Sequence, residues 1–458
     1  MIPRQIRTAL MGSLLTLAGL ALISFRLPVP ALAGTHNGNL RARGQYGHYH
    51  PTITSFSVTK TDDTMNYPST LVDIPDEHTT FIPLSGPHDF SPAPGSFFDT
   101  YLVFASSAIK GGTGGTVVLE TSDLINFDFA SNLGYADQVM APPVPFTTCD
   151  PAYNTEFDEN YSAPGTVLQN PAGRPGDFFM FYEAENHCPG GAWQQPYYAT
   201  IGFAKSSDFG RTWPSPVNSE FGGPDRHPIL KGPNPEPASE PTPPGPAPMG
   251  DAIPSAFLDR NYRNENYVYV TYNYGVGPGN GKSDGLVRFA RAKLGDDHWH
   301  GDADDGQLTF MKWFNGSFSQ PGIGGQDSGP VPTGACPGRQ GMSSISFNDD
   351  LGLYMFIFFC DSFAEDGYGA WYYSTATSLD LQDWTPPQII ENSRSKIISP
   401  CPKSGSGSQF DGFYPSLMSP GARAGHIRLT GKIFFMNGCD TGLPRAFTSK
   451  TFTITIAP

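Results

Sequence analysis

The sequence predicts an all-β protein with a five-bladed β-propeller fold, and three observations support this prediction. Helical periodicity is nearly absent after residue 33, while short aromatic and β-branched runs, which are typical of strands, follow one another along the chain. A similar strand opening recurs five times, at intervals of 72, 90, 89 and 72 residues. A polar turn also recurs between predicted strands, and internal repeats of this kind indicate stacked supersecondary units.

Each strand opening is a short segment that ends in proline or serine. The five openings are residues 88–92, 160–164, 250–254, 339–343 and 412–415, and an aromatic run follows each one. Runs that are apolar on both faces suit sheets that are packed on both sides, as the blades of a propeller are. We therefore expect a propeller domain over 85–458, with blades at 85–145, 155–225, 250–320, 338–392 and 410–456. Residues 34–84 are expected to supply an outer strand that closes the ring.

The recurring turn is complete at residues 206–213, which read Ser-Ser-Asp-Phe-Gly-Arg-Thr-Trp. Asp208 is expected to accept hydrogen bonds from the backbone of its own turn, and Trp213 to pack between sheets. The segment resembles the Asp-box of sialidases and related propellers, where it is a structural repeat. Sialidase activity is the less favoured interpretation, because the Phe/Tyr-Arg-Ile-Pro segment of that family does not occur here.

Residues 1–33 are predicted to be a secretion signal that is removed from the mature chain. Arg4 and Arg7 precede an apolar run, and Ala31-Leu32-Ala33 offers a cleavage site. The alternative is an uncleaved anchor, although the run is short for a membrane span. We expect a secreted, extracellular protein, in which the six cysteines form up to three disulfides, including a Cys149–Cys188 bridge.

Composition limits the partners of the chain. The formal net charge of −15 would repel nucleic acid and anionic membranes, so a neutral ligand fits better. We expect a monomer that binds carbohydrate and needs no cofactor. A structural calcium site at the acidic segment 302–306 is an alternative that the sequence leaves open. The residue spacing of this segment departs from that of an EF-hand loop, however, and favours a solvated turn.

One mouth of the propeller is the expected functional site. The start of the innermost strand of a blade and the end of its second strand lie at the same end of the sheet, because the two strands are antiparallel. Strand alternation also places Glu183, Glu185 and His187 on one face. The side chains expected at this mouth are His88, Asp89, Glu159, Tyr161, Glu183, Glu185, His187, Asp251, Arg339, Gln340 and Asp411.

The openings resemble those of the five-bladed glycosidases of glycoside hydrolase family 43 and its relatives. Residues 88–92, 161–164 and 251–259 look like the first, second and third blade openings of that family. The resemblance implies that Asp89 is the general base and that Asp251 tunes the pKa of the acid. The fourth blade departs, because residues 339–342 read Arg-Gln-Gly-Met where the family carries an acid glutamate in a Glu-Gly-Pro segment.

These observations predict a secreted glycoside hydrolase that acts on a neutral poly- or oligosaccharide. One carboxylic acid would protonate the leaving oxygen while a carboxylate activates water or attacks carbon. Asp89 is the predicted base, Asp251 the tuning residue, and Glu183 or Glu185 the donor. The predicted substrate-binding residues are His88, Tyr161, Glu159, His187, Arg339, Gln340 and Asp411. The alternative is a non-catalytic propeller that binds glycan or protein, which the missing fourth-blade glutamate favours.

Overall fold

The computed structural model describes residues that lie between Pro51 and Ala457. The described ranges are 51–72, 74–84, 100–109, 114–143, 157–170, 176–187, 198–213, 226–232, 248–259, 266–276, 286–294, 308–331, 336, 339–361, 367–398, 409–439 and 445–457. Several predictions therefore lie outside the described residues. They are the signal at 1–33, His88 and Asp89, the Cys149–Cys188 bridge, and the acidic segment 302–306.

Five groups of antiparallel strands follow one another along the chain, and a parallel pairing of Ala199 with Gly250 joins the second and third groups into one nine-stranded sheet. The first contains β4 (Thr80–Leu84), β5 (Thr100–Ile109) and β6 (Gly114–Thr121), with β3 (Leu71–Val72), β7 (Asp128–Phe129) and β8 (Gln138–Met140) at its edges. The second is β9 (Tyr161–Gln169), β10 (Phe178–Asn186), β11 (Tyr198–Ser206) and β12 (Arg226–Leu230). The third is β13 (Pro248–Asp259), β14 (Asn266–Val276), β15 (Val287–Leu294), β16 (Met311–Phe314) and β17 (Ser317–Pro321).

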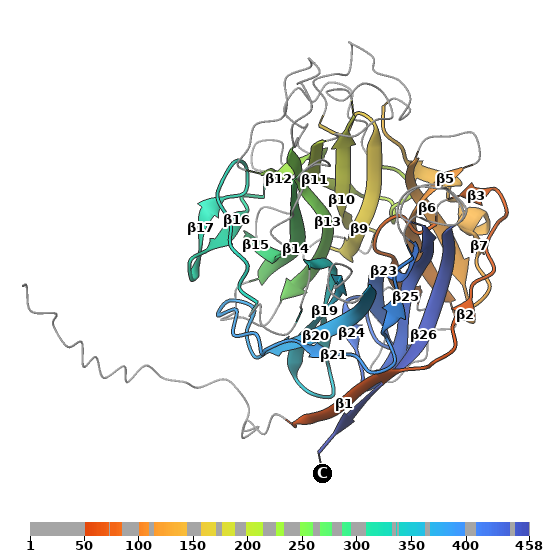
Figure 1. The fold of residues 1–458 in the computed structure, drawn as a ribbon. Coiled ribbons are helices and arrows are strands. Elements are labelled where there is room, and N and C mark those ends of the chain that lie inside the picture. The colour runs from red at the N-terminus through yellow and green to blue at the C-terminus, as the bar shows by residue number, and fades with distance from the viewer. Residues whose placement is uncertain are drawn as a thin grey trace, which may run out of the picture. The chain divides into compact units, whose positions relative to one another are not determined.

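The last two sheets complete the set. The fourth contains β18 (Arg339–Asn348), β19 (Leu353–Asp361) and β20 (Tyr368–Ala376), followed by β21 (Gln388–Ile389) and β22 (Ser395–Lys396). The fifth contains β23 (Gln409–Met418), β25 (Thr430–Cys439) and β26 (Arg445–Ile456). Its outer strands are β1 (Ile53–Val58) and β2 (Asp63–Thr64), and β24 (His426–Ile427) pairs with β18. Figure 1 shows β1 beside β26, which come from opposite ends of the described chain.

Five hydrophobic clusters lie between neighbouring sheets and close the ring. Strand β10 shows how, because Phe178 and Met180 pack in a cluster with the first sheet, while Phe179 and Phe181 pack in a cluster with the third. Two further clusters join the third sheet to the fourth and the fourth to the fifth. The last cluster brings Phe81 of the first sheet against Phe434 of the fifth. This arrangement confirms the five-bladed β-propeller, and it explains why the strands are apolar on both faces.

Hydroxyl groups join the innermost strands of successive blades. Thr80 Oγ1 accepts a hydrogen bond from the amide of Val167, at 3.1 Å, and Thr166 Oγ1 accepts one from Ala256, at 3.0 Å. The remaining bonds run from Ile345 N to Ser255 Oγ, at 3.2 Å, and from Thr79 N to Ser416 Oγ, at 2.9 Å. The last of these links the fifth blade to the first. Strands β4, β9, β13, β18 and β23 are therefore the inner strands of the propeller.

The first blade opens earlier than the sequence suggested. Its inner strand is β4, which lies within the predicted 34–84 segment and pairs with β5. The residues that lead into β4 are Asp76, Glu77 and His78, whereas the predicted opening at 88–92 falls outside the described residues. Proline 83 interrupts the sequence pattern of β4, which explains why this strand is hard to recognise.

The polar turn at 206–213 follows β11. It is held by hydrogen bonds between its own residues. Asp208 Oδ1 accepts a hydrogen bond from the amide of Thr212, at 3.0 Å, and Ser206 Oγ accepts one from Gly210, at 2.9 Å. Gly210 has a φ of 78°, and a Cβ there would lie 2.8 Å from Phe104 of the first blade. Trp213 contacts the same Phe104 ring at a centroid distance of 6.5 Å. The turn therefore packs one blade against its neighbour.

A disulfide joins Cys336, which precedes β18, to Cys360 near the end of β19. Within the described ranges, no helix is long and apolar enough to cross a membrane.

Candidate functional site

Three glutamates gather at one mouth of the propeller. Glu77 precedes the inner strand β4 of the first blade, and Glu183 and Glu185 lie near the end of β10, the second strand of the second blade. The start of an inner strand and the end of a second strand thus meet at the same mouth, as the sequence reasoning requires. All three side chains are buried, with exposures of 2% for Glu77, 3% for Glu183 and 8% for Glu185. We call these three residues the mouth cluster.

The carboxyl groups of the mouth cluster form a row. Glu183 is the central member, because the carboxyl groups of both Glu77 and Glu185 act on its pKa. His187 continues the row, because its Nε2 lies 2.5 Å from Oε2 of Glu185. At the other end of the row, Oε2 of Glu77 is buried and makes no hydrogen bond within the described residues. Four acid–base side chains are therefore in sequential contact.

Burial and mutual repulsion raise the pKa values of the mouth cluster. Burial, followed by the charge of Glu185, raises the pKa of Glu183 to about 8. Burial raises the pKa of Glu185 to about 7, and burial together with the charge of Glu183 raises that of Glu77. Burial lowers the pKa of His187 to about 4, so this imidazole is neutral at pH 7. Adjacent carboxyl groups of this kind titrate as a unit and hold shared protons near neutral pH.

Strained backbone marks the same mouth. Ile253, Met342 and Tyr414 have φ values of 58°, 52° and 55°. Each lies two residues before a serine of the same inner strand. A positive φ costs a non-glycine residue of order 1–3 kcal/mol and persists only where the surroundings impose it. The register of each strand shifts at this point, which is the signature of a β-bulge. Such bulges concentrate at binding and catalytic sites.

Glu183 supports one of these bulges. Its Oε2 accepts a hydrogen bond from the amide of Ile253, at 2.6 Å. In the next blade, Oδ1 of Asn273 accepts the equivalent bond from the amide of Met342, at 2.9 Å. An amide side chain thus suffices to hold such a bulge in the fourth blade. The ionisable group of Glu183 is therefore not needed for that bond and is available for another role.

Tyr161 and Glu159 belong to the surroundings of the mouth cluster. Tyr161 pairs with Glu185 across the β9–β10 ladder, and its hydroxyl donates a hydrogen bond to the carbonyl of Asp76, at 3.1 Å. Burial, followed by the charges of Glu77 and Glu185, raises the pKa of Tyr161. Glu159 is fully buried next to Asn160, whose amide donates to the carbonyl of Glu185, at 3.0 Å.

Asp251 belongs to a different set of charges. Lys312 Nζ lies 2.8 Å from its Oδ2, and both side chains are completely buried. Lys312 also approaches Asp327, at 3.6 Å, and Asp327 pairs with Arg288, at 2.5 Å. Burial raises the pKa of Asp251 to about 6, while Lys312 opposes that shift. We call these four residues the third-blade ion network, and none of the charges that shift the pKa of Asp251 belongs to the mouth cluster.

The other predicted residues lie at the third and fourth blades or outside the described side chains. The carbonyl of Gln340 accepts a hydrogen bond from Asn273 Nδ2, at 3.2 Å, so this residue joins the inner strand of the fourth blade to the third. Arg339 lies on β18 and Asp411 on β23, at the same ends of their strands, but their side chains lie outside the described part.

Sequence reasoning missed Glu77, which the structure places with Glu183 and Glu185. The signal available was the run Asp76-Glu77-His78-Thr79-Thr80 before a strand-like segment. That run lacks the proline or serine that ended the other openings. Among the described residues, no group of three or more His, Cys, Asp and Glu side chains has a geometry that could hold a metal ion.

Comparisons with known proteins found solved structures that resemble this chain at low sequence identity. No family model and no curated protein matches the chain. The catalytic domain of a Coprinopsis cinerea family 62 α-L-arabinofuranosidase is 11% identical, with a TM-score of 0.43, and the match covers 89% of this chain and 100% of that one. A family 43 endo-arabinanase from Bacillus licheniformis is 12% identical, with a TM-score of 0.39, over 85% and 96% of the two chains.

A third solved structure, an N-acetylgalactosamine deacetylase from F. plautii in complex with blood group B trisaccharide, is 11% identical, with a TM-score of 0.41, over 88% of this chain and 94% of that one. At these identities and TM-scores the likenesses carry no argument about activity, which must come from the site itself. The chain is structurally similar, at these low TM-scores, to glycoside hydrolases of families 62 and 43.

Proposed function

We propose that this protein is a glycoside hydrolase that acts on a neutral poly- or oligosaccharide, with the mouth cluster as its acid–base machinery. The observation that carries the proposal is the row of three buried carboxyl groups with pKa values raised toward neutrality. Glycoside hydrolysis needs one carboxyl group that keeps its proton and another that accepts or replaces one. A row of carboxyl groups that share protons provides both kinds at the same pH.

Glu185 is the proton donor in this proposal. It is the least buried of the three glutamates, and its raised pKa of about 7 keeps the carboxyl group protonated in a useful fraction of molecules at neutral pH. The neutral imidazole of His187 contacts its Oε2 and fixes the orientation of the group. During hydrolysis the proton of Glu185 moves to the glycosidic oxygen as the bond from that oxygen to the anomeric carbon breaks.

Glu77 provides the second carboxyl group. Its Oε2 is buried and makes no hydrogen bond among the described residues. In this proposal it is the oxygen that takes a proton from water or attacks the anomeric carbon. Glu183 lies between the two, positioned by the amide of Ile253, and links their protonation states. In this proposal Glu77 takes the role that the sequence analysis gave to Asp89, which lies outside the described residues.

The other expectations from the sequence are part of the same proposal. Secretion after removal of residues 1–33, a monomeric state, and carbohydrate as the partner all fit an extracellular glycosidase. The role of Asp251 as a tuning residue is less favoured, because Lys312 neutralises it within the third-blade ion network. Asp251 fits better as a group that holds the third blade together.

A non-catalytic glycan-binding propeller is the second candidate, and a specific observation favours it. The strained bulge positions of the third, fourth and fifth blades hold Ile253, Met342 and Tyr414, none of which is a carboxylic acid. All acidic groups of the mouth cluster come from the first two blades. A propeller that only binds sugar would need the aromatic and apolar side chains but no proton donor.

The test is reducing-sugar release from a panel of neutral plant and microbial polysaccharides. The wild-type protein is expected to hydrolyse at least one of them, and Glu185→Gln to lower kcat about 10²- to 10⁴-fold, which is the usual contribution of a general acid. Glu391→Gln is the matched control, because Glu391 is exposed and lies on another blade. Binding without hydrolysis across the panel would replace this proposal with the binding propeller, and full turnover by Glu185→Gln would refute the assignment of the donor.

A further inference from the structure

Asp76 lies directly before Glu77, and contacts from three blades hold it in place. Its amide donates a hydrogen bond to the hydroxyl of Ser106, on β5 of the first blade. Its carbonyl accepts one from the hydroxyl of Tyr161, on β9 of the second blade, at 3.1 Å. Its carboxylate pairs with the guanidinium of Arg445, the first residue of β26 in the fifth blade. The backbone and the side chain of Asp76 are therefore fixed by separate partners.

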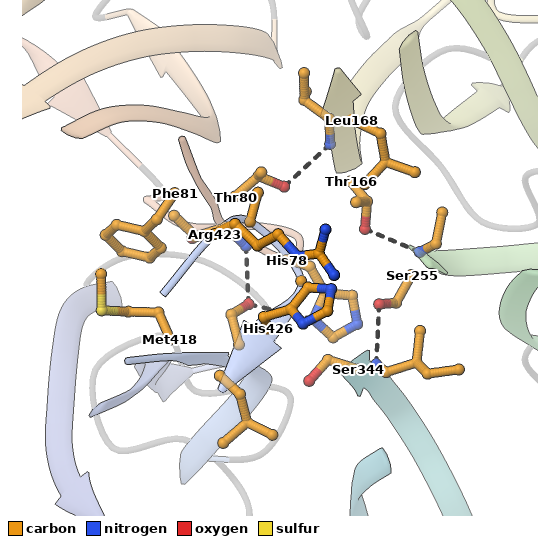
Figure 2. A pocket seen from close by; sticks show the side chains of 18 of the residues that line it. His78, Thr80, Phe81, Thr166, Leu168, Ser255, Ser344, Met418, Arg423 and His426 are labelled. Atoms are coloured by element: carbon orange, nitrogen blue, oxygen red, sulfur yellow. Dashed lines mark hydrogen bonds between the residues drawn. The ribbon is translucent and has the colours of Figure 1, made fainter. Parts of the chain in front are cut away.

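The chain that follows Glu77 is fixed as well. The amide of Thr79 donates a hydrogen bond to Ser416 Oγ, at 2.9 Å. Thr80 Oγ1 accepts one from the amide of Val167, at 3.1 Å, and Figure 2 shows this bond between the inner strands of the first and second blades. Glu77 thus lies between two anchored pieces of backbone, which set the position from which its side chain reaches the mouth cluster.

The ion pair between Arg445 and Asp76 is the longest-range of these anchors. It spans 369 residues and joins the last strand of the propeller to the segment that leads into the first blade. The side chain of Arg445 is 11% exposed and that of Asp76 is 27% exposed, so the pair lies at the edge of the folded ring. Partly exposed ion pairs add little to the free energy of unfolding. The main consequence of this pair is therefore geometric.

Arg445 acts on Glu77 through position. The charges that raise the pKa of Glu77 are those of Glu183 and Glu185, and the guanidinium of Arg445 is not among them. Loss of Arg445 would release Asp76 and so change how the neighbouring Glu77 meets Glu183. A misplacement of about 1 Å in a reacting group can lower a rate by about 10²-fold.

We propose that Arg445 and Asp76 are positioning residues of the active site, and that their ion pair holds Glu77 against Glu183 and within reach of the anomeric carbon. This inference rests on the proposed function, in which Glu77 is the second carboxyl group of hydrolysis. It links closure of the ring to the geometry of the site, because the pair exists only when the last strand lies beside the first blade.

Kinetics of Arg445→Met provide the first test. We expect kcat to fall about 10- to 100-fold with KM unchanged, because the substrate still binds while Glu77 is misplaced. Arg445→Lys keeps the positive charge and should restore part of kcat. Arg291→Met is the matched control, because Arg291 forms a similarly exposed ion pair with Asp380 between the third and fourth blades. It should leave kcat unchanged.

Two kinetic results would overturn the positioning role. A higher KM with an unchanged kcat would show that Arg445 contacts the substrate directly. Equal losses of kcat in Arg445→Met and Arg291→Met would show that any lost ion pair between blades has the same effect.

A second test needs no substrate and so separates this inference from the proposed function. With glutamate labelled by carbon-13 at the side-chain carboxyl, and with Glu77→Gln to assign the signal, Glu77 is titrated in the wild type and in Arg445→Met. Its pKa should move toward the ordinary value of 4.5 in the variant, because the carboxyl group leaves Glu183. Asp76→Asn keeps the shape of the side chain and should shift the pKa in the same direction, which covers the case in which Arg445→Met does not fold.

An unchanged titration of Glu77 in the folded variants would overturn the inference. A wild-type protein that hydrolyses no polysaccharide would instead contradict the proposed function, whereas the titration still decides whether Arg445 and Asp76 position Glu77.

Discussion

Two buried acidic groups lie in neighbouring blades of this propeller and differ in how their charge is balanced. The mouth cluster holds three glutamates in contact with one another and with a neutral histidine. The third-blade ion network holds Asp251 and Asp327 with Lys312 and Arg288. Both groups are buried to a similar degree. The comparison shows that burial alone does not indicate function: the network contains its own counter-charges, whereas the mouth cluster must hold protons instead.

Removing the counter-charge from the network should have the largest effect on stability. Lys312→Met would leave Asp251 and Asp327 buried with a single remaining cation, and breaking a buried pair in this way costs about 3–5 kcal/mol. The free energy of unfolding, measured in urea, should fall by that amount. Glu183→Gln is the comparison variant, since glutamine can still accept the Ile253 amide, and its cost should be below about 1 kcal/mol. Equal losses of unfolding free energy in Lys312→Met and Glu183→Gln would mean that both groups of residues have only a structural role.

A smaller effect is expected from one hydrogen bond of the network. The hydroxyl of Tyr272 donates to Asp327 Oδ2, at 3.1 Å. Tyr272→Phe should lower the free energy of unfolding by about 1.5–3 kcal/mol, as is usual for a bond to a charged group. Lys312→Met combined with Tyr272→Phe should lose less than the sum of the two single changes, because both act on Asp327. Strict additivity would show that the residues do not form one network.

The two groups should also give different pH dependences of stability. A carboxyl group whose pKa is raised on folding binds more protons in the folded state, so stability falls as pH rises from the unfolded pKa to the folded one. For Glu183 and Glu185 that window runs from 4.5 to about 8 and about 7, and for Asp251 from 3.8 to about 6. Each group contributes a slope of up to about 1.4 kcal/mol per pH unit. In the Glu183→Gln variant, stability should fall less steeply between pH 6 and 8. An unchanged slope in that range would contradict the raised pKa of Glu183.

The sequence predicted much of the fold and part of the site. The repeated openings and aromatic runs placed the second to fifth blades, because each inner strand must bury both of its faces. Strand alternation placed Glu183 and Glu185 at the mouth. The first blade was harder, since β4 contains Pro83 and its opening lacks the repeated proline, and so Glu77 was overlooked. The sequence also could not reveal that Lys312 lies against Asp251, because a contact across 61 residues depends on the packing of strands within the blade.

Cysteine pairing shows the same limit. The six cysteines allowed many connectivities, and the structure contains a Cys336–Cys360 bridge that no spacing pattern singled out. These residues meet because β18 and β19 are antiparallel, which places the start of one strand beside the end of the other. Glu77 and Glu185 come from different blades and lie at one mouth because Glu77 precedes the inner strand β4 and Glu185 is near the end of the second strand β10. Local patterns predict elements, whereas contacts between strand ends follow from the closed ring.

A carbon-13 NMR titration of the glutamate carboxyl groups tests the central claim most directly, because it requires no substrate. With glutamate labelled at the side-chain carboxyl carbon, and with Glu183→Gln and Glu185→Gln to assign the signals, two carboxyl groups should titrate near pH 7 and pH 8. Proton retention by the mouth cluster at neutral pH would then be established. If every glutamate in the folded protein instead titrates near its ordinary value of 4.5, the mouth cluster is ionised at neutral pH and cannot supply the proton that glycoside hydrolysis needs.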